Sequence, residues 1–173
     1  MEKMEQELKV LEEQKVDKGL IEAVAEFRAE HKVDERVKNR IIKPDMAFFG
    51  KEVLEMGIAA LLKGENLLLT GPKATGKNIL AENLAWIFAR PVYNISFHVT
   101  DSGDLIGTDT FENNEVKLRK GSIYRCAEYG GFGILDEINM AKNDAVSVLH
   151  ATLDHRRSID VPGYDKIEMD DAT

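Results

Sequence analysis

The chain has 173 residues, enough for one domain of ordinary size, and 43% of them are hydrophobic, enough to build a buried core. The net charge of −8 argues against a nucleic-acid partner, because binding to phosphates usually needs a basic surface. No apolar run approaches the roughly 20 residues of a membrane-spanning helix, no secretory signal is visible, and the single cysteine excludes an internal disulfide. We therefore expect a soluble, cytoplasmic protein with no membrane partner.

Residues 1–43 predict a helical N-terminal extension. The first helix carries apolar residues at heptad-like spacing, namely Met1, Met4, Leu8 and Leu11. A break at residues 17–19 separates it from a second helix over residues 20–27, and a short third stretch covers residues 33–41. We favour a solvated extension with one apolar stripe, because charge-rich helices usually face solvent. The alternative is a docking arm for another subunit.

Residues 44–173 predict an α/β core that starts at Pro44. Apolar spacing predicts helices over residues 51–63, 78–89 and 143–153. Short apolar runs predict buried strands at residues 67–70, 92–97 and 131–135. The alternation of strands and helices is typical of a parallel sheet.

A P-loop pattern, G-x-x-x-x-G-K, follows the first predicted strand, and its residues are Gly71, Pro72, Lys73, Ala74, Thr75, Gly76 and Lys77. The glycines let the backbone fold tightly around phosphate oxygens, and the helix that follows adds its positive end. Lys77 is predicted to reach the β- and γ-phosphates of ATP. The pattern therefore predicts a P-loop NTPase of the three-layer sandwich type.

The residue after Lys77 departs from the usual pattern. A serine or threonine normally binds Mg²⁺ there, whereas this chain has Asn78. An amide oxygen is also a hard ligand that suits Mg²⁺, so we expect metal–nucleotide binding to persist, with Asn78 as a candidate ligand. Ile79 completes the predicted nucleotide-binding segment.

An apolar run ending in two acids forms the second half of the predicted site. Residues 133–135 lead into Asp136 and Glu137, which is a Walker B pattern. Successive side chains diverge at the end of a strand, so Asp136 is predicted to hold Mg²⁺ while Glu137 serves as the general base for an attacking water.

With both motifs placed, the chain resembles an AAA+ ATPase of the MoxR-like branch from about Phe48 to Gly163. The segments that carry the resemblance, besides the two motifs, are Phe48–Lys51, Asp104–Gly107, Lys120–Ile123, Asp136–Asn139 and Asp154–Ile159. The resemblance implies that Phe49 and Gly50 border the adenine. It also implies that Asp154–Ile159 is the turn into a hairpin that precedes the sensor strand.

The resemblance further implies a ring, often a hexamer, that uses ATP to remodel or mature a partner protein, often one of the von Willebrand A type. Residues 108–120 would then be an insert that contacts the partner. From the residues alone this is a polar loop, and Glu112–Glu115 is consistent with a hairpin tip. The family's sensor strand, arginine finger and helical lid would follow residue 173, so we expect a partial AAA+ core.

Two other functions remain open. The chain could be a nucleotide-binding interaction module that does not hydrolyse ATP, or a P-loop small-molecule kinase. The acid pair and the insert favour the AAA+ ATPase over the kinase.

Overall fold

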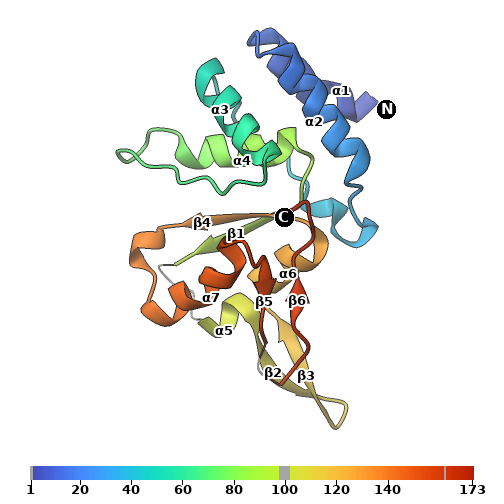
Figure 1. The fold of residues 1–173 in the computed structure, drawn as a ribbon, viewed down its shortest axis with the longest axis vertical. Helices are drawn as coiled ribbons and strands as arrows, with labels where there is room; N and C mark the ends of the chain where they lie inside the picture. The colour runs from blue at the N-terminus through green and yellow to red at the C-terminus, as the bar shows by residue number, and fades with distance from the viewer. Residues whose placement is uncertain (1, 98–101, 162) are drawn as a thin grey trace. The chain divides into compact units, whose positions relative to one another are not determined.

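The computed structural model describes residues 2–97, 102–161 and 163–173 (Figure 1). These residues form two compact units, Met1–Arg90 and Pro91–Thr173. Within the described ranges, no helix has both the length and the hydrophobicity to cross a membrane. The predicted boundary between residues 43 and 44 is not where the chain divides into these units, and the proposed role of the extension stays a prediction.

The first unit is helical (Figure 1). Its elements are α1 (Glu2–Glu13), α2 (Lys18–Glu30), the 3-10 helix η1 (Glu35–Arg40), α3 (Lys51–Leu62) and α4 (Lys77–Ile87). The three helical stretches predicted before residue 44 are thus confirmed. The break between α1 and α2 has a clear cause, because the Asp17 carboxylate accepts hydrogen bonds from the Gly19 and Leu20 amides and so starts a new helix.

The apolar stripe of α1 and α2 is buried inside this first unit rather than left on a separate arm. Leu11 and Val24 are fully buried, and α2 packs against α3. A buried ion pair, Glu7–Arg28 at 3.4 Å, joins α1 to α2. Burial lowers the pKa of the Arg28 guanidinium, although the charge of Glu7 opposes this effect. Residues 1–43 and the helices that follow them therefore share one core.

The predicted strand at residues 67–70 is not formed. Within the part of the chain that the structure describes, this segment pairs with no strand, and Leu68 is 77% exposed. A strand is defined by backbone hydrogen bonds to a neighbour, which an apolar run alone does not provide. This expectation was wrong for the structure as described.

The second unit contains a parallel pair of strands, β1 (Val92–Ser96) and β4 (Phe132–Asp136), in the register Val92↔Phe132 to Ser96↔Asp136. Both strands were predicted, and their parallel pairing confirms the α/β class. Strand β1 is mostly buried, whereas β4 is only half-buried. The helices of this unit are α5 (Ser102–Ile106), α6 (Ser122–Tyr129), η2 (Ile138–Met140) and α7 (Asn143–Leu153).

Two antiparallel hairpins complete the second unit. Strands β2 (Gly107–Glu112) and β3 (Glu115–Lys120) are joined by Asn113 and Asn114, which both have positive φ, at 52° and 66°. These angles are typical of a two-residue type I′ turn, and they confirm the predicted hairpin tip. Strands β5 (Ser158–Ile159) and β6 (Ile167–Glu168) form a second hairpin, so a hairpin is present here, but Ser158 and Ile159 lie in its first strand rather than in the turn that leads into it.

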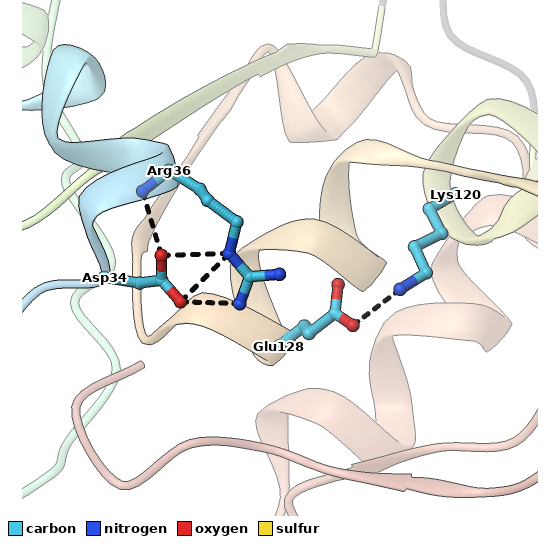
Figure 2. A network of polar contacts seen from close by, with 4 residues as sticks. All are labelled: Asp34, Arg36, Lys120 and Glu128. Carbon is cyan, nitrogen blue, oxygen red and sulfur yellow. Dashed lines mark hydrogen bonds and ion pairs between the residues drawn. The ribbon is translucent and has the colours of Figure 1, made fainter.

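Each unit also contains a well-defined ion pair, and both pairs are drawn in Figure 2. In the second unit, Lys120 Nζ lies 2.5 Å from Glu128 Oε1 and so links the end of β3 to α6; this bond raises the pKa of Lys120. In the first unit, Arg36 donates hydrogen bonds to the Asp34 carboxylate and lowers its pKa to about 2. The acidic carboxylate of Asp34 therefore stays charged at the start of η1, where it acts as the N-cap.

Candidate functional site

The P-loop forms a tight, exposed turn that ends at the first residue of α4. Gly76 has φ 84° and ψ 16° and is the N-cap of the helix, and Gly71 has φ 150°. These backbone angles are ones that glycine adopts without strain. Inside the turn, the Thr75 hydroxyl donates to the Pro72 carbonyl at 2.9 Å, which closes the loop on itself.

Lys77 is the first residue of α4, and its side chain folds back over the loop. Its Nζ donates to the carbonyl oxygens of Gly71 at 3.0 Å and Pro72 at 2.7 Å. The ammonium group is therefore held beside the backbone that a phosphate would approach. On binding, it would exchange two neutral carbonyl acceptors for phosphate oxygens, whose negative charge attracts the ammonium group more strongly.

The other predicted P-loop residues lie in the turn and in the first turn of α4. Lys73 and Ala74 are exposed at the top of the turn, and Ala74 has φ 60°. Asn78 is exposed in the first turn of α4, while Ile79 is half-buried. All of these side chains are exposed or half-buried, so a nucleotide can bind here without displacing a side chain from the core.

A segment ahead of α3 lies against this loop. The Phe48 ring is in van der Waals reach of Gly76, because a Cβ placed on that glycine would lie 3.7 Å from Phe48 Cε2. Phe49 is 79% exposed, and Gly50 is the N-cap of α3. The structure therefore brings Phe48 and the P-loop together within the first unit, and the adenine contact of Phe49 and Gly50 stays a prediction.

Two side chains that hold this segment were not singled out from the sequence. Gln14, just after α1, bonds to Phe48 and Gly50, and Asn83 of α4 bonds to Met46 and Phe48. The sequence pattern could have singled out Asn83, because it is the one polar residue among the buried, otherwise apolar residues of α4. Gln14 carries no such signal in the local pattern.

The acid pair lies at the end of β4 in the second unit. Asp136 is the last residue of the strand, and Glu137 follows with φ 54° and ψ 41°. The Glu137 amide donates to Asp136 Oδ1 at 2.9 Å. Both residues are exposed. The left-handed conformation ends the strand and starts η2, so the two carboxylates project from different backbone conformations.

The donor chemistry of the predicted metal ligands fits magnesium. Asp136 in the second unit carries a carboxylate and Asn78 in the first unit an amide oxygen, and each taken by itself is a hard oxygen ligand of the kind that Mg²⁺ binds. Among the residues described by the structure, no group of three or more histidine, cysteine, aspartate or glutamate side chains could hold a metal by itself. The described residues therefore provide no site at which protein side chains alone would surround a metal ion.

Comparisons of the sequence with known proteins include a family model that covers the same two motifs. Residues 66–172 match the family model of the AAA domain, dynein-related subfamily. The uncharacterized protein YojN of Bacillus subtilis (strain 168) is 35% identical over 115 residues, which are 64% of this chain and 38% of YojN. The uncharacterized protein SERP0979 of Staphylococcus epidermidis is 32% identical over 116 residues, 64% of this chain and 44% of that protein.

A third relative, the uncharacterized protein SSP1341 of Staphylococcus saprophyticus, is 35% identical over 104 residues, 57% of this chain and 40% of that protein. The chain therefore spans less than half the length of the curated relatives it matches. The family model covers both the P-loop and the acid pair, and it extends over more than half of the chain. Together with the parallel strand pair and the loop geometry, this match shows that the chain belongs to the AAA+ ATPases, in the dynein-related subfamily of AAA domains.

Proposed function

We propose that this AAA domain binds ATP with magnesium and that ATP hydrolysis drives the remodelling or maturation of a partner protein. The proposed binding of ATP rests on the geometry of the P-loop. There, Lys77 begins α4, and its ammonium group donates hydrogen bonds to the carbonyls of Gly71 and Pro72. A helix N-terminus, a glycine-bounded turn and a lysine together form an anion site that matches a triphosphate.

In this proposal the catalytic roles follow from chemistry. The backbone N–H groups of the P-loop, which Pro72 lacks, and the ammonium of Lys77 bind the phosphates. Asp136 and Asn78 would each supply an oxygen ligand to magnesium, and the bound ion would neutralise phosphate charge. Glu137 accepts the proton of the attacking water as general base.

The β2–β3 hairpin supports the proposed partner contact and the MoxR-like branch. Phe111 and Val116 are directly paired near the tip of the hairpin, yet they are 71% and 61% exposed. An apolar pair exposed on a rigid hairpin is suited to a protein contact. We propose that this hairpin is the insert that engages the partner, a protein of the von Willebrand A type, and that the domain works in the cytoplasm as part of a hexameric ring. The partner class and the ring size follow from the resemblance to the MoxR-like branch.

The matched part is less than half of each relative, so the activity of the whole protein belongs to the proposal. We propose that the sensor residue and the arginine finger that complete the site are supplied by residues outside this chain. A nucleotide-binding module without hydrolysis is the second candidate. A phosphate-release assay on the assembled protein separates the two, because only the ATPase turns over.

Replacing Lys77 by alanine tests nucleotide binding. Losing one charge-assisted contact should weaken the binding of Mg-ATP by about ten- to a hundredfold. The measurement is calorimetric titration of the 173-residue chain, and the matched control is Lys63→Ala, because Lys63 is an exposed lysine that caps α3 outside the loop. The control should bind like the wild type. Equal affinity in the Lys77→Ala variant and the wild type would refute the P-loop assignment.

A further inference from the structure

We infer that Gln14 is a positioning residue for the nucleotide site, through which the N-terminal helices hold the P-loop ready for its ligand. The inference rests on the proposed nucleotide binding and extends it to a part of the chain outside the P-loop motif. It concerns the first unit alone, in which Gln14, the Phe48–Gly50 segment and the P-loop all lie.

The Gln14 amide makes two hydrogen bonds to one short segment of backbone. Its Nε2 donates to the Phe48 carbonyl at 2.9 Å, and its Oε1 accepts from the Gly50 amide at 3.1 Å. A side-chain amide offers a donor and an acceptor in one plane, so it binds the two backbone groups as a neighbouring strand would. Gln14 is half-buried, which limits competition from water.

Asn83 holds the same segment from α4, the helix that begins at Lys77. The Phe48 amide donates to Asn83 Oδ1 at 3.2 Å, and Asn83 Nδ2 donates to the Met46 carbonyl at 2.9 Å. Asn83 is only 2% exposed. The segment is therefore fixed by hydrogen bonds from two sides, one from the end of α1 and one from the P-loop helix.

The Phe48 ring transmits this restraint to the loop. A Cβ on Gly50 would lie 2.9 Å from Phe48 Cε1, and one on Gly76 would lie 3.7 Å from Phe48 Cε2. The ring thus packs beside the glycine whose left-handed backbone ends the P-loop. When the segment is loosened, the ring no longer restrains Gly76, and the loop has to be ordered at the moment of binding, which lowers affinity.

The fold has a separate attachment that should survive the loss of Gln14. The Asp17 amide donates to Glu55 Oε1 at 2.8 Å, which joins the turn between α1 and α2 to α3. Leu11 and Val16 are also buried on either side of Gln14. A change at Gln14 should therefore alter the ordering of the Phe48–Gly50 segment more than the packing of α1.

The test is a double-mutant cycle in the 173-residue chain, with Mg-ATP affinity measured by calorimetry and thermal unfolding recorded alongside. Gln14→Met keeps the length of the side chain and removes both hydrogen bonds, so we expect affinity to fall by about three- to tenfold. Glu13→Met is the matched control, because Glu13 is the exposed neighbour of Gln14 in the chain. It should leave the affinity unchanged.

Phe48→Leu supplies the second arm of the cycle. If Gln14 acts through the Phe48 ring, the double variant should bind no more weakly than the weaker single variant, because the two changes remove one coupling. Additive losses would overturn the inference and indicate a general structural effect. Wild-type affinity in Gln14→Met, with binding still lost in Lys77→Ala, would overturn the inference alone. A wild-type chain that does not bind Mg-ATP would refute the proposed function itself.

Discussion

Two adjacent acids at the end of β4 differ in backbone conformation more than in chemistry. Asp136 ends a strand in register with Ser96, whereas Glu137 adopts a left-handed conformation that is uncommon for a residue with a side chain. The Asp136 carboxylate accepts a hydrogen bond from the next amide, which limits its orientations. Two carboxylates fixed in different ways are suited to different tasks.

The proposed roles predict separable effects of replacing each acid. In the assembled protein, Glu137→Gln should keep nucleotide binding and lower turnover by roughly 10²- to 10⁴-fold, because only the general base is lost. Asp136→Asn should in addition raise the magnesium concentration needed for binding. Phosphate release and titration with Mg²⁺ measure the two effects. Full activity in both variants would contradict the assignment.

At the scale of elements, the β2–β3 hairpin depends on its two-residue turn. Asn113 and Asn114 both occupy the left-handed region, which asparagine tolerates better than alanine does. The strands run in continuous register from Glu112↔Glu115 to Gly107↔Lys120, so the turn fixes every pair in the hairpin. The exposed Phe111–Val116 pair is placed by this register.

Asn114→Ala should therefore destabilise the hairpin by about 1 kcal/mol, because at positive φ the Cβ of alanine crowds the following carbonyl oxygen and the methyl group cannot form the local hydrogen bonds open to asparagine. Asn114→Gly is the control and should be neutral or slightly stabilising, since glycine adopts this conformation freely. Nuclear magnetic resonance of the Thr110 and Lys117 amides would measure the population of the paired state. A hairpin equally populated in both variants would show that the turn does not set its stability.

Local patterns predicted most of the elements, and the exceptions have physical reasons. Helices α3, α4 and α7 and strands β1 and β4 follow the expected apolar spacing closely. Helix α6 was not predicted, although Ile123, Cys126 and Ala127 are buried at helical spacing and Gly130 ends it with positive φ. Residues 67–70 failed as a strand because pairing depends on a distant partner that the local pattern does not contain.

The candidate site shows the same division between local and distant information. The P-loop and the acid pair are contiguous motifs, so the sequence alone predicts them. The hydrogen bonds from Gln14 and Asn83 to Phe48 join residues 34 and 35 positions apart, and no local periodicity records such contacts. These hydrogen bonds form only because α1 and α4 pack around the Phe48–Gly50 segment in the folded chain.

At the scale of the whole molecule, residues 67–70 place exposed apolar side chains directly ahead of the P-loop. Leu67 and Leu68 are 36% and 77% exposed, and no strand among the described residues pairs with them. Unpaired extended backbone with apolar side chains favours association with another chain. The isolated 173-residue chain should therefore self-associate at high concentration.

Leu68→Lys should reduce this association, because a charge on an extended segment opposes pairing with another chain. Met56→Lys is the matched control: Met56 is 65% exposed, but it lies in α3, where the backbone is already hydrogen-bonded. Light scattering after size-exclusion chromatography measures the mass of both variants. An equal reduction in both would indicate that apolar surface, rather than unpaired backbone, causes the association.

The chain has one tryptophan and one cysteine, and they lie in different units. Trp86 is 8% exposed in α4, with Lys43 Nζ 5.7 Å from its ring, so its fluorescence reports on the first unit. Cys126 is 3% exposed in α6, and its thiol donates to the Gly131 carbonyl at 3.1 Å. Reaction of that thiol with an alkylating reagent requires the second unit to open. Each unit thus carries its own native reporter, and the unfolding of the two can be followed separately in one sample, by tryptophan fluorescence for the first unit and by the rate of thiol alkylation for the second.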